Sequence, residues 1–489
     1  MNYLLAIDQG TSSTRAMLYD IGGKLITASQ YPLTQFYPNP GWVEHDPEEI
    51  WSKTLKAMQD VVARVEPQKI IACGITNQRE TTVIWDKQTG KCLAPAIVWQ
   101  DRRTEGFCQS LSEYTKLLQK KTGLLPDPYF SASKLHWLLE TIPEARTLAA
   151  KNRLAFGTMD TFLIWRLTHG QAHLTDVSNA SRTLLFNILE QRWDDELLTL
   201  FNIPISVLPE VCASDSHFGV IDQVHVGANI PITGVAGDQQ SALIGQRCFS
   251  DGMVKATFGT GGFLLMNTGK LPVVSNHRLL TTIAYRIKDE TVYGLEGSLY
   301  HAGTTIKWLR DEMKLIDTAA ETETLARGLT SNEGVYLVPS FTGLGAPHWF
   351  STPGAAIVGL SRTTNRAHFA RAALEAVCYQ TRDVLDCMRD DSHLDVSLLR
   401  VDGGMAANQW FLQYLASQCG LTVQLPSDIE TTAQGAAMLA ALGCGLVGSL
   451  DALQKTWQCA KEFSAEQTEV IEMDYSGWKR ALNMVMAGR

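Results

Sequence analysis

The sequence predicts an α/β protein with two similar lobes that enclose a cleft. A strand, a glycine-containing turn and a second strand open the chain at residues 3–19, and the same arrangement recurs at residues 253–267. Residues 47–65 and 367–388 each place apolar side chains on one face of a helix that would cover a sheet. This repetition predicts lobes that meet near residue 246, and a cleft between lobes is the default ligand site.

The first lobe, residues 1–246, is expected to begin with three short meandering strands and a helix. The strands are rich in apolar and β-branched side chains and are separated by the turns Q-G-T-S-S-T and D-I-G-G-K; they span residues 3–8, 15–19 and 25–30. Asp46 followed by Pro47 is typical of an N-cap and a first helical position. Further strands are predicted at residues 70–76, 82–85, 96–99 and 230–235.

The second lobe, residues 247–489, is expected to repeat this plan. Strands are predicted at residues 253–258, 263–267 and 398–402. The first two flank a G-T-G-G turn, and the third runs through a G-G pair into a helix. Residues 431–450 carry no charge over nearly the length of a membrane span, but glycines interrupt them. We therefore expect a buried helix at residues 432–442 and no membrane segment.

Composition argues against several classes of protein. The chain has 42 Lys and Arg against 51 Asp and Glu, a net charge of −9 without basic blocks, so no nucleic-acid partner is expected. The ten cysteines never fall at C-x-x-C spacing, which favours buried free thiols over zinc or thioredoxin sites. Met1 leads into an apolar strand without the basic start of an export signal, so we expect a cytoplasmic protein. The sequence leaves the oligomeric state open, a homo-oligomer included.

Two hairpin turns are candidate phosphate loops. P-loop, Rossmann, zinc-protease and hydrolase-elbow motifs do not occur in the chain. In the first turn, Asp8 ends a strand, Gly10 allows close approach of the backbone to a ligand, and Arg15 adds a cation. The amides and hydroxyls that would surround phosphate oxygens belong to Thr11, Ser12 and Ser13. An Asp beside phosphates can hold Mg²⁺ through water. Alone this turn is more often an ordinary hairpin, but a second such turn at residues 259–262 makes a phosphate site more probable.

Other polar motifs have both structural and functional interpretations. The V-D-G-G turn that begins at Val401 either lays a nucleotide on bare backbone at a helix N-terminus or serves tight packing only. Asp238 and Gln239 follow a strand, where α/β folds bind ligands, but a first-turn or N-cap role is the favoured interpretation of Asp238 alone. A surface ion pair and a core aromatic are the simplest interpretations of Arg79-Glu80 and Trp99.

Two longer motifs resemble the signatures of the FGGY carbohydrate kinases. Y-F-S-A-S-K-L-H-W-L at residues 129–138 is similar to the first signature and departs at Thr141, whereas residues 355–375 resemble the second without a break. The resemblance spans nearly the whole chain and is strongest to members that phosphorylate glycerol, through G-I-T-N-Q-R-E-T-T and I-V-W-Q-D-R-R. It implies the actin-like ATPase fold, with two RNase-H-like lobes and ATP and Mg²⁺ in the cleft.

The resemblance also implies a role for each candidate residue. The first phosphate loop would comprise Asp8 and residues 10–15, including Thr11, Ser12, Ser13 and Arg15, and the second would comprise Gly259, Thr260 and Gly261. The nucleotide would further contact Gly303, Gly403, Gly404 and Asn408. Glycerol would be surrounded by Arg79, Glu80, Trp99, Tyr129, Asp238, Gln239 and Phe263. Asp238 would be the general base, and Asp8 and Asp238 would hold Mg²⁺ through water.

Rival functions share parts of this site. A kinase for another small polyol or a ketopentose would keep the phosphate loops, as would an actin-like ATPase without a polyol substrate. The residues that distinguish these rivals are Arg79, Glu80 and Trp99.

Residues 224–231 form a shorter loop than the sugar-bisphosphate site of some relatives and lack its Arg, and residues 463–474 do not match a segment that contacts a phosphotransfer protein. Neither form of regulation is therefore expected.

Overall fold

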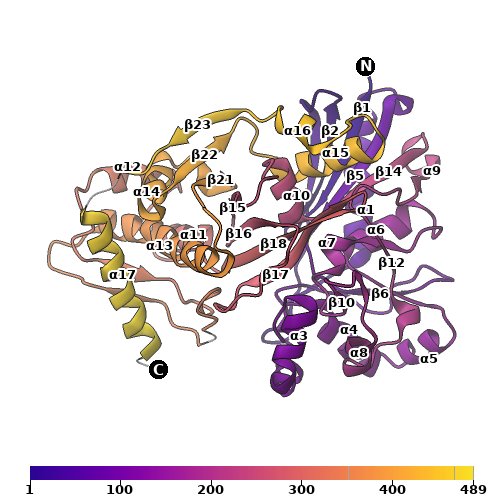
Figure 1. The fold of residues 1–489 in the computed structure, drawn as a ribbon, viewed down its shortest axis with the longest axis horizontal. Coiled ribbons are helices and arrows are strands. Elements are labelled where there is room, and N and C mark those ends of the chain that lie inside the picture. The colour runs from indigo at the N-terminus through magenta and orange to yellow at the C-terminus, as the bar shows by residue number, and fades with distance from the viewer. Residues whose placement is uncertain (351, 467–468, 488–489) are drawn as a thin grey trace.

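The computed structural model describes residues 1–350, 352–466 and 469–487 and contains two large mixed sheets (Figure 1). The first sheet comprises, in spatial order, β13 (Val220–Ile221), β14 (Ile230–Gly237), β5 (Ile70–Asn77), β1 (Tyr3–Gln9), β2 (Ser13–Asp20) and β3 (Leu25–Pro32). The second comprises β17 (Leu280–Ile287), β18 (Glu290–Leu299), β16 (Gly262–Gly269), β15 (Val254–Phe258), β21 (Leu398–Asp402), β22 (Thr422–Pro426) and β23 (Cys459–Phe463).

The two sheets have the same internal pattern, which confirms the predicted duplication. In the first, β1 pairs antiparallel with β2 and parallel with β5, and β2 pairs antiparallel with β3. In the second, β15 pairs antiparallel with β16 and parallel with β21, and β16 pairs antiparallel with β18. Each sheet also has an antiparallel strand at the far edge, β13 on β14 and β23 on β22. Of the predicted strand at residues 96–99, only β7 (Ala96–Ile97) forms.

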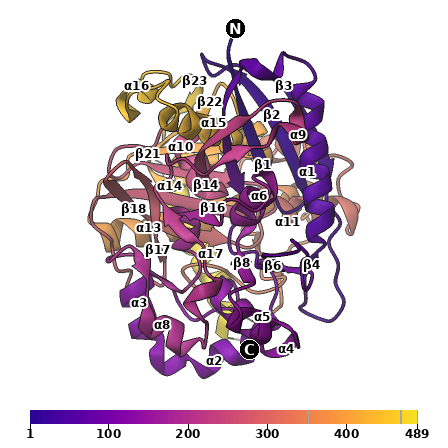
Figure 2. The same cartoon turned by 90° about the vertical axis from the view of Figure 1, so that its right-hand side faces the viewer.

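Each of the two helices predicted from the hydrophobic pattern packs on a sheet. Helix α1 (Pro47–Val62) packs against β2 and β3 and runs beside them in Figure 2. The carboxylate of Asp46 caps it by accepting a hydrogen bond from the Glu48 amide at 2.9 Å, and the helix ends three residues earlier than predicted. Helix α13 (Arg366–Ser392) packs against β16 and β18.

Two helices are exchanged between the halves of the chain. Helix α10 (Asp238–Gly245) follows β14 but reaches β15 and β16, whereas α15 (Thr431–Gly443) packs on β14, β5 and β1 of the first sheet (Figure 1). The contact is so close that a Cβ on Gly74 would lie 2.0 Å from the Ala436 carbonyl oxygen. The uncharged helix is therefore a buried interlobe element, and among the described residues no helix has the length and apolar character of a membrane span. The boundary near residue 246 stays a prediction.

Residues of the first half also reach the second sheet. Helix α7 (Val177–Ala180) packs on β17, and Gly123 at the end of α3 (Thr115–Thr122) accepts from the Thr281 amide of the same strand at 2.9 Å. The Tyr293 hydroxyl of β18 donates to the Ile188 carbonyl at 2.9 Å. This contact places the loop after α7 next to β18. Side chains from both halves of the sequence can therefore meet there.

The remaining elements are shorter or lie further from the cleft. The helices are α2 (Glu105–Ser110), α4 (Ser131–Thr141), α5 (Ala145–Ala150), α6 (Met159–Leu167), α8 (Asp195–Leu200), α9 (Gln223–Val226), α11 (Gly303–Asp311), α12 (Glu321–Arg327), α14 (Gln409–Cys419), α16 (Leu450–Gln454) and α17 (Glu469–Ala487). The short strands are β4 (Glu44–His45), β6 (Val83–Asp86), β8 (Leu154–Gly157), β9 (Leu174–Asp176), β10 (Phe186–Asn187), β11 (Arg192–Trp193), β12 (Glu210–Cys212), β19 (Tyr336–Val338) and β20 (Ala356–Val358). The ten cysteines are free thiols, as predicted, but only five of them are buried, and Cys444 and Cys459 are exposed. In the segment 463–474, residues 467 and 468 lie outside the described residues.

Candidate active site

Three aromatic rings from both lobes form one wall of the cleft. Trp99 follows β7, Tyr129 precedes α4, and Phe263 lies on β16 of the second sheet. The ring centroids of Trp99 and Tyr129 are 5.6 Å apart, and those of Trp99 and Phe263 are 6.1 Å apart. All three side chains are half-buried, so each keeps a surface that can face a ligand. The expectation that Trp99 serves the core alone is therefore incomplete.

Arg79 and Glu80 are buried, so the surface ion pair that their sequence suggests is wrong. They follow β5, and Arg79 is 3% exposed while Glu80 is 1% exposed. Glu80 has a positive φ of 60°, a strained conformation for a residue with a side chain that is often found at functional sites. Burial raises the pKa of Glu80, although Arg79 and Arg182 oppose this shift. The physical reason for the error is that the partner carboxylate, Glu296, lies far away in the sequence.

Asp238 lies where the first sheet meets the second. It is the first residue of α10, with a side chain that is 31% exposed, and its Oδ1 lies 3.1 Å from Nε of Arg79. The next residue, Gln239, is buried and accepts a hydrogen bond from Nζ of Lys255 on β15. Burial lowers the pKa of Lys255 to about 8, even though the carboxylates of Asp402, Asp238 and Glu296 favour its charged form. The predicted first-turn position of Asp238 is thus confirmed, and it adjoins a charged cluster.

The first predicted phosphate loop is the tight turn between β1 and β2. The amide of Gly10 donates to the Ser13 carbonyl at 2.9 Å, and the indole of Trp99 donates to the Thr11 hydroxyl at 2.9 Å. Ser12 is exposed, so the turn presents hydroxyls next to the aromatic wall. Arg15 is engaged by two carboxylates, Asp8 at 2.5 Å and Glu430 at 2.6 Å. A phosphate would therefore compete with these carboxylates for the guanidinium.

The second predicted phosphate loop is hydrogen-bonded to the start of helix α11. The Gly303 amide donates to the Gly259 carbonyl at 2.9 Å, and the Thr260 carbonyl accepts from the Thr304 amide at 3.1 Å. A Cβ at Gly303 would lie 2.6 Å from the Gly259 carbonyl oxygen, which explains why the position is a glycine. Turn residues Gly259 and Thr260 are exposed, and Gly261 is half-buried. Hydrogen bonds to α11 therefore fix one side of the loop, while the turn residues on the other side remain exposed.

The predicted adenosine residues adjoin this loop. Gly403 has a φ of +87° and backs onto Phe258, whose carbonyl oxygen would lie 2.6 Å from an added Cβ. Gly404 has no atom within 4 Å of an added Cβ among the described residues, so its open side faces free space. Asn408 caps α14 by accepting from the Phe411 amide at 2.9 Å, and it also donates to the Thr322 hydroxyl at 3.3 Å. Part of the role of Asn408 is therefore structural.

Residues that sequence analysis missed complete the charged cluster. Arg182 and Glu296 are both fully buried and belong to the loop after α7 and to β18. A usable signal existed for Glu296, because a carboxylate inside the strand sequence G-L-E-G-S-L needs a buried partner. Lys255 in M-V-K-A-T-F gives the same signal.

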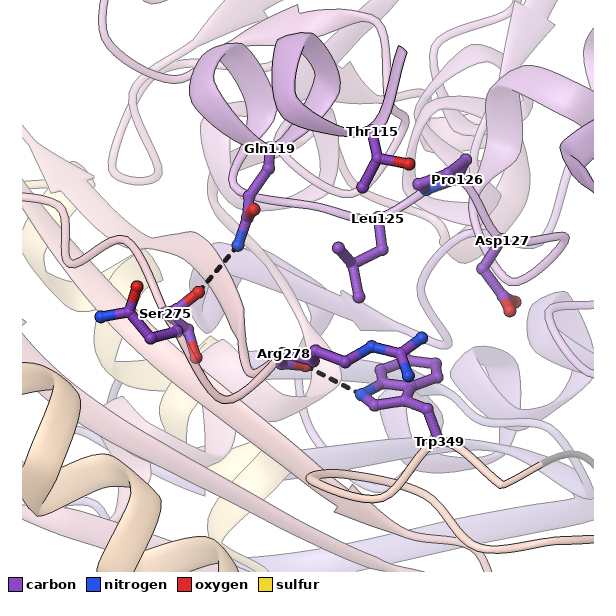
Figure 3. Close-up of a pocket in the computed structure, with 9 residues that line it drawn as sticks. Thr115, Gln119, Leu125, Pro126, Asp127, Ser275, Arg278 and Trp349 are labelled. Atoms are coloured by element: carbon purple, nitrogen blue, oxygen red, sulfur yellow. Dashed lines mark hydrogen bonds between the residues drawn. The ribbon is translucent and has the colours of Figure 1, made fainter. Parts of the chain in front are cut away.

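A cavity of about 430 Å³ lies beside the site rather than in it (Figure 3). Gln119 of α3, Asp127, Arg278 and Trp349 line it, and the indole of Trp349 donates to the Arg278 carbonyl at 2.8 Å. Asp127 also accepts from the Tyr129 amide at 2.8 Å, which connects the cavity to the aromatic wall. None of the predicted site residues is among the described residues that line this cavity.

Comparison with known proteins agrees with this arrangement. Residues 3–245 match the FGGY family of carbohydrate kinases, N-terminal domain, and residues 254–444 match the C-terminal domain of that family. A glycerol kinase of Alcanivorax borkumensis is 53% identical to this chain and is aligned over 99% of it and 98% of its own length. The crystal structure of Plasmodium falciparum glycerol kinase with ADP is 38% identical, covers 99% of this chain and 98% of its own, and superposes with a TM-score of 0.93.

A more distant structure shows how far the fold extends. The ligand-bound xylulose kinase of Lactobacillus acidophilus superposes with a TM-score of 0.89 over the whole of both chains at 20% identity. The two duplicated mixed sheets, the cleft residues and these matches confirm the two-lobed, actin-like ATPase fold that the sequence predicts. The family domains cover most of the chain, and the chain therefore belongs to the FGGY family of carbohydrate kinases.

Proposed function

We propose that this protein transfers the γ-phosphoryl group of ATP to a terminal hydroxyl of glycerol and produces sn-glycerol 3-phosphate. The observation that carries the proposal is the pocket in which buried Arg79 and Glu80 lie beneath the wall of Trp99, Tyr129 and Phe263, with Asp238 next to them. The glycerol kinases that the chain resembles support the same substrate. The reaction is expected in the cytoplasm.

The pocket has suitable chemistry for a small triol. Arg79 can donate hydrogen bonds to hydroxyl oxygens, while Glu80, Asp238 and the carbonyl of Gln239 can accept from hydroxyl protons. The aromatic wall can cover the C–H groups of the same molecule. A compact substrate suits this combination, because the rings are only half exposed and the charged groups lie directly beneath them. We therefore assign the seven residues of the predicted set to glycerol.

ATP is assigned to the opposite side of the cleft. The turns at Thr11–Ser13 and Gly259–Gly261 would hold the phosphates through amides and hydroxyls, and Arg15 would add positive charge. Gly303, Gly403 and Gly404 would let the nucleotide approach bare backbone, and Asn408 lies at the start of α14 beside them. Glycerol-dependent ADP release is the behaviour expected of this arrangement.

Asp8 and Asp238 fit a magnesium site of the kind that works through water. Burial raises the pKa of Asp8, Arg15 opposes this shift, and the charge of Asp238 raises the pKa further. We assign the two carboxylates to one cation. Among the described residues, no three His, Cys, Asp or Glu side chains converge as direct ligands, which suits a cation held mainly by phosphate and water. When bound, Mg²⁺ would neutralise charge on the β- and γ-phosphates.

The protein's own residues would orient the hydroxyl, accept its proton and exclude water. Asp238 is the proposed general base, because it is partly exposed and lies beside Arg79 and Gln239 of the glycerol set. The aromatic wall includes Phe263 from the second sheet, so approach of the two lobes would also shield the reacting groups.

Release of ADP from ATP by the purified protein tests the proposal. We expect a rate that depends on glycerol, with the product consumed by a dehydrogenase specific for sn-glycerol 3-phosphate. Parallel assays with xylulose, ribulose and erythritol test the kinase for another polyol or ketopentose. ADP release that is the same with and without any polyol would favour an actin-like ATPase and contradict the proposal.

A further inference from the structure

Four buried charged side chains form a network beneath the aromatic wall. Arg79 and Glu80 come from the loop after β5, Arg182 from the loop after α7, and Glu296 from β18 of the second sheet. The side chains of Arg79 and Glu80 are 2% exposed, and those of Arg182 and Glu296 are fully buried. The partly exposed carboxylate of Asp238 also lies 3.1 Å from Nε of Arg79, so the four buried charges adjoin a third carboxylate at the pocket. Of the four, only Arg79 and Glu80 belong to the proposed glycerol set.

Arg182 contacts two residues of that set. Its Nε donates to Oε1 of Glu80 at 2.7 Å, and its Nη2 donates to Oε1 of Glu296 at 2.8 Å. The same guanidinium lies 5.5 Å from the ring centroid of Tyr129 and 5.3 Å from that of Phe130. One planar group therefore fixes the Glu80 carboxylate and lies against the Tyr129 ring.

Glu296 holds both arginines from the other lobe. Its Oε2 accepts from Nη1 of Arg79 at 2.5 Å, and its Oε1 accepts from Nη2 of Arg79 at 3.2 Å as well as from Arg182. Burial favours the neutral acid, yet the guanidiniums of Arg182 and Arg79 hold the pKa of Glu296 below its usual range. Glu296 is paired with Leu265 of β16, two residues from Phe263 of the aromatic wall. The carboxylate is therefore fixed to the sheet that supplies Phe263.

We infer that Arg182 and Glu296 are positioning residues that hold Arg79, Glu80 and Tyr129 in the geometry that binds glycerol. Neither is proposed to touch the substrate. Glu296 fixes Arg79 from the second lobe, and Arg182 fixes Glu80 and Tyr129 from the first. Because the network crosses from one lobe to the other, the glycerol pocket takes its full shape only when both lobes are in contact. This inference rests on the proposed function.

A purely stabilising role is a weak explanation for such a network. Burying paired charges is costly, and apolar replacements of similar volume are often as stable or more stable. Charged pairs provide something that apolar side chains do not, because paired hydrogen bonds between a guanidinium and a carboxylate fix the direction of both groups as well as their distance. A positioning role predicts that glycerol binding is more sensitive than either folding or ATP binding.

Glu296→Gln is the first test, because it keeps the shape of the side chain and removes its charge. We expect the KM for glycerol to rise about tenfold or more, the size of a lost charge-assisted contact, while the KM for ATP stays within about twofold. Calorimetric titration of glycerol without nucleotide should show the same weakening.

Glu375→Gln is the matched control. Glu375 is also fully buried and also holds an arginine, with Nε of Arg371 at 2.7 Å, but both lie within α13. We expect this variant to lower the melting temperature while both KM values stay within about twofold. A rise in the KM for glycerol of equal size in both variants would attribute the effect to general loosening and overturn the inference.

Arg182→Lys is the second test, because it keeps the charge and removes the fork. A single ammonium cannot reproduce the separate contacts to Glu80 and Glu296, so we expect the same selective rise in the KM for glycerol. If both network variants leave that KM within twofold, the inference is overturned. If neither variant folds although Glu375→Gln does, the network is a folding element and the inference is likewise overturned. Wild-type protein without glycerol-dependent ADP release would instead overturn the proposed function.

Discussion

On the substrate side of the cleft the groups that face a ligand are charged and aromatic side chains, whereas on the nucleotide side they are mostly peptide groups of glycine turns. Arg79 and Glu80 are buried and are held by partners from distant parts of the chain. Gly259 and Gly303 meet through their own backbones. A substrate contact is therefore removed by shortening a side chain, and a nucleotide contact is blocked by adding one.

The largest effect is expected at Asp238, which stands between the two sides. Asp238→Asn keeps the shape of the side chain but cannot accept a proton, so kcat should fall about 10²–10⁴-fold while the melting temperature and ATP binding stay near wild type. Steady-state kinetics and thermal unfolding on the same preparation check this. If the carboxylate serves α10 only, the variant will retain most of its activity, since Asn suits a helix start about as well as Asp.

The next effect is expected on the substrate side alone. Arg79→Ala removes charge-assisted contacts of about 1.5–3 kcal/mol, so the KM for glycerol should rise about 10–100-fold and that for ATP should change little. The variant should also be less stable than wild type, because Glu296 and Asp238 lose a guanidinium partner. An unchanged KM for glycerol would place Arg79 outside the pocket.

On the nucleotide side, the matched pair is Gly303→Ala and Gly404→Ala. The first adds a Cβ 2.6 Å from the Gly259 carbonyl oxygen, and the second adds one in free space. Overpacking of about 1–2 kcal/mol at Gly303 should raise the KM for ATP about 5–30-fold and leave that for glycerol unchanged. Gly404→Ala should keep the wild-type melting temperature, so any rise in its KM for ATP reports contact with the nucleotide. If these variants changed the KM for ATP and the KM for glycerol equally, the distinction between the substrate side and the nucleotide side of the cleft would be contradicted.

The last prediction concerns Lys255, which donates to Gln239 of the glycerol set, and it tests stability rather than turnover. Its pKa is lowered by burial to about 8 from an ordinary 10.5, so the unfolded chain binds more protons than the folded protein between these values. The stability of the wild type should therefore rise with pH across that window. Urea unfolding of wild type and Lys255→Met at pH 8 and pH 10 isolates this contribution. A variant with the same pH dependence as wild type would show that Lys255 is not the group that titrates.

The nucleotide side is also the part of the site that local sequence predicts best. The G-T-S-S and G-T-G-G turns lie between strands whose apolar side chains alternate along the sequence. Both loops and the duplicated sheets can therefore be predicted from patterns within a few residues. The network around Arg79 cannot be found this way, because Glu296 lies 217 residues further along the chain and Arg182 lies 114 residues before Glu296. Local patterns suggested a surface pair there. The bounds of β7 and α1 are also predicted two and three residues too long, and α1 passes into a local turn in which the Arg64 and Val65 amides donate to the Val61 and Val62 carbonyls.

The exchange of α10 and α15 has a consequence for synthesis on the ribosome. The first sheet is fully translated once β14 has emerged, but α15, which covers β14, β5 and β1, follows roughly 200 residues later. At usual elongation rates of about 5–20 residues per second, α15 is synthesised about 10–40 s after the strands that it covers. During this interval a nascent chain displays an apolar surface that a chaperone or a neighbouring chain can bind, so slow elongation between Gly245 and Thr431 would favour aggregation before the first ATP is bound.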